Sequence, residues 1–273
     1  MPDEVPAEFA SALLATATRR GPFGSRLLYF HDIGSTNDEA GRLAEAGAPE
    51  GTTVVAGAQH AGRGRFGRTW FSPPGAGLYA SIVIRDRRAA ALLTLAGGVA
   101  IAESIRVLTG LPAEIKWPND IVIAAGLGRR RKLAGILAEG TSGVEGLQYV
   151  VLGFGINILR AAYPPAISTA ATSLEAELGR PVLPALIFAE CLAAIAERVR
   201  ELSSGSSDQV LRRWIELSPS SRGTRVDWET PTGNLTGVTA GIDSDGALLV
   251  RRGTGLERIV SGGINWGWMS DDE

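Results

Sequence analysis

Segment 62–70 reads Gly-Arg-Gly-Arg-Phe-Gly-Arg-Thr-Trp and combines three arginines with three glycines. Guanidinium groups bind phosphate and carboxylate oxygens two at a time, and glycine allows the backbone to approach a ligand closely. The flat face of Trp70 offers a surface on which a ring can stack. The segment therefore predicts a site for a small anion, and a nucleotide fits it best.

Two other interpretations of this segment fail on its surroundings. Gly62, Gly64 and Gly67 have the spacing of a dinucleotide-binding fingerprint, but that turn must open a crossover helix. Only residues 68–77 precede the next predicted strand, and 73–75 reads Pro-Pro-Gly, which cannot form the helix. Arg/Gly tracts that bind RNA are usually repeated and disordered, whereas this one is single and follows a predicted strand.

Further polar clusters lie where strands are interrupted or end. Segment 116–120 reads Lys-Trp-Pro-Asn-Asp, and its proline breaks a strand. The break exposes Asn119, whose amide could read a nucleobase, and Asp120, whose carboxylate could bind Mg²⁺; an Asx turn is the alternative. Lys132 begins an apolar strand and Asn157 ends another. Each of these last two is, taken alone, an ordinary strand-end residue.

Segment 35–39, Ser-Thr-Asn-Asp-Glu, first predicts the start of a helix. Thr36 and Glu39 have the spacing of a capping box. A helix start can also present polar groups to a ligand, so the structural and the binding roles do not conflict.

The elements that must position these clusters indicate an α+β fold with a mixed sheet. Apolar periodicity and turn residues predict helices over 6–19, 36–47, 89–108, 172–178, 184–202 and 207–217. Strands are predicted over 26–30, 52–59, 78–84, 113–117, 121–125, 132–139 and 148–156, with a hairpin loop over 126–131. Residues 224–268 alternate in short stretches between turns, which predicts a small β-barrel. We therefore expect one domain over 1–219 and a second over 220–273.

Composition removes several classes of function. The 27 basic and 29 acidic residues leave a net charge of −2, without the basic excess of a duplex-binding protein. Cys191 is the single cysteine, so no intramolecular disulfide or thiolate metal cluster is expected, and its helical context predicts core packing. Neither a membrane span nor a signal peptide is evident, which predicts a cytoplasmic protein.

Taken together, the five clusters follow the order and spacing of one family. They closely resemble the biotin protein ligases, and the resemblance extends over about residues 29–269, where 241–243 and 246–249 match the family's C-terminal barrel. It implies the fold shared by class II aminoacyl-tRNA synthetases and lipoate ligases, a mixed β-sheet with flanking helices, followed by a Src-homology-3-like barrel. The arginine–glycine loop and the Lys-Trp-Pro-Asn-Asp segment are the specific parts of the match.

The resemblance implies a two-step reaction with ATP, biotin and Mg²⁺. Biotin and ATP would give biotinyl-5′-adenylate, and a lysine of a biotin carrier domain would then take the biotinyl group. The implied catalytic residues are Lys132, Arg63 and Arg65. The implied biotin-binding residues are these three together with Ser35, Thr36, Asn37, Gln59, Gly62 and Gly135. The implied ATP-binding residues are Arg68, Trp70, Lys116, Asn119 and Asn157, with Asp120 as the Mg²⁺ ligand. With three unpaired arginines, the loop is expected to be mobile when empty.

The resemblance also sets expectations about partners. The carrier domain would belong to acetyl-CoA, acyl-CoA or pyruvate carboxylase, and a weak or ligand-dependent homodimer is left open. Thirty-four residues precede Ser35, too few for the DNA-binding domain of some relatives, so a short form without DNA binding is expected. Phe66 stands where some relatives have a basic residue. The alternatives are a lipoate or octanoate ligase of the same fold and a non-catalytic adenylate-binding module.

Overall fold

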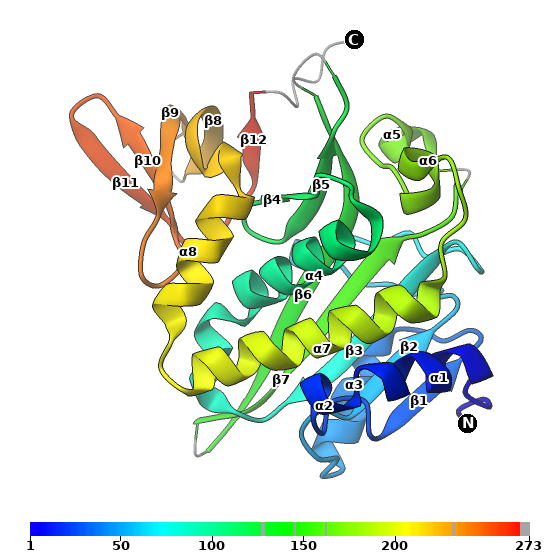
Figure 1. Cartoon of the computed structure of the whole chain (residues 1–273). Coiled ribbons are helices and arrows are strands. Elements are labelled where there is room, and N and C mark those ends of the chain that lie inside the picture. The colour runs from blue at the N-terminus through cyan, green and yellow to red at the C-terminus, as the bar shows by residue number, and fades with distance from the viewer. Residues whose placement is uncertain (127–128, 145, 162, 231–232, 268–273) are drawn as a thin grey trace.

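The computed structural model describes residues 1–126, 129–144, 146–161, 163–230 and 233–267. Part of the predicted hairpin loop, at 127–128, and Trp268 at the end of the predicted barrel lie outside these ranges. The described chain forms a large sheet layered with helices and a smaller sheet beside it, joined through α8 (Ser207–Leu217) (Figure 1).

The large sheet has seven strands in the order β1-β2-β3-β7-β6-β5-β4. β1 and β2 pair in parallel and the other neighbours are antiparallel, so the predicted mixed sheet is confirmed. The strands are β1 (Leu27–Phe30), β2 (Thr53–Ala56), β3 (Gly77–Ile84), β4 (Glu114–Lys116), β5 (Asp120–Ala124), β6 (Arg130–Gly143) and β7 (Gly146–Asn157).

Helices cover both faces of this sheet, because its central strands alternate between two apolar cores. α4 (Leu93–Thr109), α7 (Pro184–Ser203) and α1 (Ala7–Ala15) cross one face (Figure 1), where Val55 and Ile82 are buried. α3 (Thr36–Glu45) packs on the other face against β2, β3 and β7, where Val54 and Val83 are buried. The remaining helices are α2 (Ala17–Arg20), α5 (Pro165–Ser168) and α6 (Leu174–Leu178).

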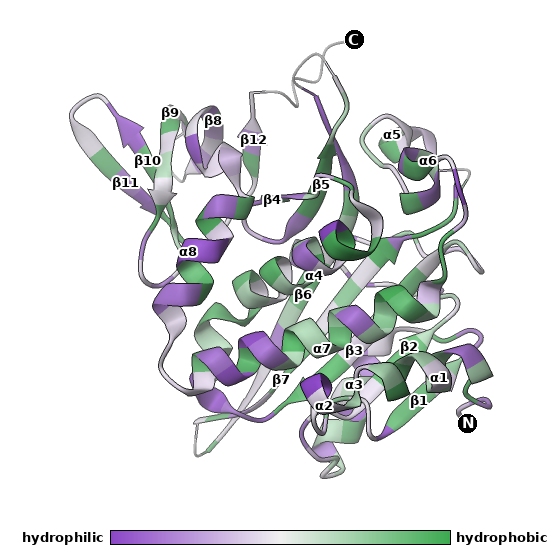
Figure 2. Ribbon diagram, viewed as in Figure 1, coloured by the Kyte–Doolittle hydropathy of each residue, from purple (hydrophilic) through white to green (hydrophobic). Residues whose placement is uncertain are grey.

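The helical stretch Arg87–Thr109 is long and apolar enough to cross a membrane, but 67% of its most hydrophobic window is buried inside the molecule. Its second part, α4, packs against α7, α8 and the sheet. Figure 2 shows hydrophobic residues concentrated on α4 and the strands behind it, and many hydrophilic ones on α8. On α7, burial raises the pKa of the Cys191 thiol to about 12, in agreement with the predicted core role.

Some helices differ from the predicted ones in their boundaries, and the backbone at those positions gives the reason. The predicted helix over 6–19 divides at Thr16, whose φ and ψ of −107° and 6° leave the helical range. The predicted helix over 89–108 starts with a 3₁₀ segment, Arg87–Leu92. α5 was not predicted, because four residues are too few to show a helical period.

The predicted small β-unit is present as a five-stranded antiparallel sheet in the order β11-β10-β9-β8-β12. Its strands are β8 (Arg222–Thr230), β9 (Gly233–Ile242), β10 (Leu248–Arg252), β11 (Gly255–Ile259) and β12 (Ile264–Trp266). It contacts the large sheet through a turn, where Trp117 Nε1 donates to the Gly246 carbonyl at 2.9 Å. The domain boundary between 219 and 220 stays a prediction.

Candidate active site

A cavity of about 880 Å³ opens between the arginine–glycine loop, strands β4–β7, segment 163–171 and the small sheet. We call it the main cavity. The predicted site residues that line it are Ser35, Thr36, Asn37, Gln59, Arg63, Arg65, Arg68, Trp70, Lys116, Asn119, Asp120, Lys132, Gly135 and Asn157. Gly62 lines an adjoining hollow, together with the rest of the loop, Leu137 and Glu139. Residues that lie more than a hundred positions apart in the chain are thus brought to one place.

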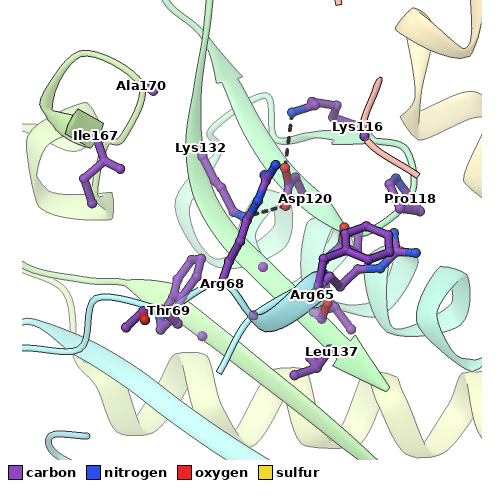
Figure 3. Close-up of a pocket in the computed structure, with 18 of the residues that line it drawn as sticks. Arg65, Arg68, Thr69, Lys116, Pro118, Asp120, Lys132, Leu137, Ile167 and Ala170 are labelled. Carbon is purple, nitrogen blue, oxygen red and sulfur yellow. Dashed lines mark hydrogen bonds and ion pairs between the residues drawn. The ribbon is translucent and has the colours of Figure 1, made fainter. Parts of the chain in front are cut away.

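Two lysines and one aspartate meet at the strand ends in this cavity (Figure 3). Lys132 Nζ lies 2.6 Å from Asp120 Oδ1, and Lys116 Nζ lies 3.3 Å from Oδ2. Burial would raise the pKa of Asp120, but the two ammonium groups outweigh it, and the pKa lies below its usual range. Lys132 Nζ also lies 4.9 Å from the centre of the Trp70 ring, at cation–π distance. The cluster therefore holds one net positive charge before any ligand binds.

The arginine–glycine loop forms a tight turn over the cavity. Gly64 N donates to Arg68 O at 2.7 Å, and Phe66 adopts a φ of 57°, which few residues other than glycine accept. The Arg65 guanidinium lies 4.9 Å from the centre of the Phe66 ring. Burial lowers the pKa of Arg65, with Asp120 acting in the opposite direction. Within the described residues, neither Arg65 nor Arg68 makes an ion pair, so both cations are available to an anionic ligand.

Arg63 differs from the other two loop arginines. Its guanidinium lies 2.5 Å from Asp38 Oδ1 and 2.6 Å from Glu139 Oε1. The expectation of three unpaired arginines is therefore wrong for Arg63. The cause is tertiary, because the two carboxylates come from α3 and β6.

At the other end of the cavity, polar side chains at the start of α3 meet the end of β2. Gln59 Oε1 accepts from Thr36 N at 2.8 Å and from Thr36 Oγ1 at 3.1 Å. Ser81 Oγ lies 2.8 Å from Thr36 Oγ1 and 2.6 Å from Asn37 Oδ1. The helix cap is Ser35, whose Oγ accepts from Asp38 N at 3.4 Å. The predicted capping box at Thr36 is wrong by one residue, which leaves the Thr36 side chain in this network.

Trp70 rests on two glycines of neighbouring strands. A Cβ at Gly155 would lie 2.5 Å from Trp70 Nε1, and one at Gly135 would lie 3.0 Å from Cζ3. The indole therefore reaches the sheet only because both positions lack a side chain. Trp70 Nε1 is buried and has no hydrogen-bond partner among the described residues.

The two predicted adenine-side amides also support the backbone. Asn119 Nδ2 donates to Ile136 O at 2.7 Å, and Asn157 Nδ2 donates to Thr172 O at 2.9 Å. Both residues line the main cavity, so their contact with a nucleotide stays a prediction.

Comparison with known proteins agrees with this arrangement. Residues 29–157 match the model of the biotin/lipoate A/B protein ligase family, and residues 223–264 match the biotin protein ligase C-terminal domain. The bifunctional ligase/repressor BirA of Bacillus spizizenii is 33% identical over 249 residues, which cover 89% of this chain and 75% of that protein. The chain belongs to the biotin protein ligase family.

The chain is also similar to other members of the biotin protein ligase family. The biotin–[acetyl-CoA-carboxylase] ligase of Paracoccus denitrificans is 32% identical over 241 residues, 85% of this chain and 97% of that protein. The biotin protein ligase of Aquifex aeolicus, solved in complex with biotin and ATP, superposes with a TM-score of 0.76 at 26% identity. That likeness covers 89% of this chain and 98% of the other. The predicted fold and family are confirmed.

Several cavity residues of this biotin protein ligase family member were not predicted from its sequence. The small sheet contributes Asp227, Glu229, Asn234 and Asn265, and the segment after β7 contributes Tyr163. The residues of the small sheet lie far along the chain from the motifs, and Tyr163 follows Asn157 outside any recognisable motif, so one sequence gives no signal for either. Glu139 was also missed, although it follows Gly135 and Leu137 on one strand at period two, and this alternation could have placed it on the site face.

The metal prediction has a limited basis in the side chains. Among the described residues there is no group of three or more His, Cys, Asp or Glu side chains placed to hold a metal ion. Asp120 is the one predicted ligand, and its two oxygens face lysines. This donor set fits an Mg²⁺ that keeps most of its ligands from substrate phosphates and water, with at most one protein carboxylate.

Proposed function

We propose that the main cavity joins biotin to ATP and then passes the biotinyl group to a carrier lysine. The chain is an ATP-dependent biotin protein ligase of the biotin–[acetyl-CoA-carboxylase] type. The observation that carries the assignment of this cavity is the convergence of Lys116 and Lys132 on Asp120, beside two arginines that make no ion pair with any residue that the structure describes.

In the first step, a biotin carboxylate oxygen attacks the α-phosphorus of ATP and pyrophosphate leaves. Two anions must approach each other, and a unit charge pair at about 4 Å is worth about 4 kcal/mol at an effective dielectric near 20. Cations fixed in place before the reaction are therefore the strongest means of lowering the barrier. In this proposal Lys132 bridges the carboxylate and the α-phosphate, and its 2.6 Å ion pair with Asp120 supports a fixed position before they bind.

The remaining proposed roles are those that the family resemblance implies, and these residues all line the cavity. Arg63 and Arg65 order the loop over the ligand and its phosphates, Arg68 and Lys116 face the triphosphate, and Trp70 packs beside the adenylate. The network of Ser35, Thr36, Asn37 and Gln59 offers hydrogen-bonding groups to the ureido ring of biotin. Asn119 and Asn157 lie on the adenine side. The Mg²⁺ that accompanies ATP would bind Asp120 and neutralise phosphate charge.

In the second step, the amine of the carrier lysine attacks the carbonyl carbon of the adenylate, AMP leaves, and the nitrogen loses a proton. The new bond is an amide. The arginine–glycine loop covers the mixed anhydride before that attack and limits its contact with water.

The proposed partner is the biotin carboxyl carrier domain of an acetyl-CoA, acyl-CoA or pyruvate carboxylase, in the cytoplasm. The proposal includes no DNA partner. The residues ahead of the family match form α1 and α2, which pack against α7. A weak or ligand-dependent homodimer stays a prediction.

The rival function is a lipoate ligase, because the matching family model includes those enzymes. Pyrophosphate exchange with biotin and with lipoate, each with Mg·ATP, decides between the two. We expect exchange with biotin and transfer of biotin to a purified carrier domain. Exchange with lipoate alone would contradict the proposal. Thermal stabilisation by biotin and ATP without any transfer would favour a non-catalytic adenylate-binding module.

A further inference from the structure

Glu139 lies between the two ends of the site and is shared by them. Its Oε1 lies 2.6 Å from the Arg63 guanidinium, and its Oε2 accepts from Asn37 Nδ2 at 2.7 Å. Arg63 belongs to the loop over the phosphate side, and Asn37 belongs to the start of α3 on the ureido side. One carboxylate on β6 therefore holds both parts at once.

The Asn37 side of this contact is held in one orientation. Asn37 is 7% exposed, and its Oδ1 lies 2.6 Å from Ser81 Oγ. A Cβ at Gly153 would lie only 2.0 Å from that Oδ1, so the asparagine lies directly on β7. An amide fixed this way directs its Nδ2 donor at Glu139.

The Arg63 side of the contact controls the rest of the loop. Trp70 N donates to Gly62 O at 2.9 Å and Gly64 N donates to Arg68 O at 2.7 Å, so the turn moves as a unit. Fixing Arg63 therefore also fixes the backbone that carries Arg65 and Arg68. Each ion pair of Arg63 is partly exposed and worth little alone. The contact is weak enough to open for substrate entry.

We infer that Glu139 is a positioning residue that couples the ureido end of the cavity to closure of the arginine–glycine loop. The inference rests on the proposed function for the identity of the ligand. A ligand that orders Asn37 stabilises the Asn37–Glu139–Arg63 chain of contacts and, through it, the closed loop. Asp38 also pairs with the Arg63 guanidinium and so strengthens closure. The acceptor of the Asn37 amide, however, is Glu139.

The test compares Glu139→Gln with Asp38→Asn. A glutamine has one acceptor oxygen for the two donors that Glu139 satisfies, so one contact must be lost. Glu103→Gln is the matched control, since it removes a carboxylate from the ion pair with Arg213, away from the cavity. Limited trypsin cleavage after residues 63, 65 and 68 reports loop opening in the ligand-free protein, and pyrophosphate exchange reports KM and kcat.

For Glu139→Gln we expect cleavage in the loop to be about two to five times faster and KM for biotin to rise by a similar factor. The expected kcat stays within about twofold and Tm stays near that of Glu103→Gln. Asp38→Asn should also speed cleavage but should raise KM for biotin less. Unchanged cleavage in a folded Glu139→Gln would overturn the inference, and equal KM effects in both variants would overturn the coupling through Asn37. Cleavage needs no activity, so a failure of the proposed function would be seen separately.

Discussion

The two lysines of the cavity are bound to Asp120 to different degrees. Lys132 makes the shorter contact, 2.6 Å against 3.3 Å for Lys116, and it also lies over the Trp70 ring. Because only 15% of the Asp120 side chain is exposed, its charge is less screened than a surface charge and holds both ammonium groups before substrate arrives. Preorganised charge of this kind lowers a barrier without reorganisation during the reaction.

Lys132→Ala should reduce pyrophosphate exchange by a factor on the order of 10²–10³, because the cation between carboxylate and α-phosphate is lost. Arg130→Ala is the control, since it removes an equal charge two residues away on β6, where the guanidinium pairs with Glu114. The control should retain most of the exchange. Near-normal exchange in folded Lys132→Ala would show that another group activates the carboxylate.

At the scale of elements, β7 changes its role along its length. On one face of the strand, Tyr149 and Val151 pack under α3, and the next residues on that face are Gly153, Gly155 and Asn157 at the cavity. Because side chains alternate between the two faces of a strand, one face of β7 packs in the core at its start and lines the cavity at its end. Gly153 admits Asn37, and Gly155 admits the Trp70 indole.

Gly155→Ala should displace the Trp70 indole, because the added Cβ would lie 2.5 Å from its Nε1. We expect KM for ATP in pyrophosphate exchange to rise by at least about tenfold. Overpacking by an added methyl group costs about 1–3 kcal/mol, and about 1.4 kcal/mol corresponds to a factor of ten. Gly140→Ala is the control, because its Cβ would meet the flexible end of Leu147 at 3.0 Å, away from the cavity. Similar KM values in Gly155→Ala and the control would mean that the indole does not help to form the ATP site.

At the scale of the whole molecule, the small sheet is held to the catalytic sheet beside the site. Trp117 Nε1 donates to Gly246 O within the segment that also supplies Lys116 and Asp120. Gly246 has a φ of +81°, and a Cβ there would lie 2.6 Å from Leu95 Cδ1 on α4. Because the small sheet lines part of the main cavity, this contact helps to set the shape of the site.

Trp117→Phe tests this contact against Trp214→Phe. Both residues are buried, but Trp214 Nε1 has no hydrogen-bond partner among the described residues. Trp214→Phe therefore removes ring volume and no hydrogen bond, whereas Trp117→Phe removes both. Trp117→Phe should therefore lower the free energy of unfolding by about 1–3 kcal/mol more than the control. Denaturant unfolding measures the difference. Equal losses would show that the bond to Gly246 adds nothing to stability.

The sequence by itself determined the family, the mixed α+β sheet and most cavity residues, because its motifs lie at strand ends and its apolar periods are strong. Residue types that suit anions were recognisable before any contact was known. Boundaries were less accurate: the helix over 6–19 divides at Thr16, and the cap of α3 is Ser35 rather than Thr36. At Ser35 a side-chain hydrogen bond decides where the helix starts, and at Thr16 the backbone leaves the helical range; sequence periodicity resolves neither.

Only the tertiary structure decided which charges are paired. Arg63, Arg65 and Arg68 look alike in the sequence, yet in the described part of the chain only Arg63 forms ion pairs with carboxylates, from α3 and β6. The contribution of the small sheet to the cavity likewise depends on how two sheets pack. Ion pairing and the packing of the two sheets depend on distances between residues far apart in the chain. The order of the strands in the folded protein sets those distances.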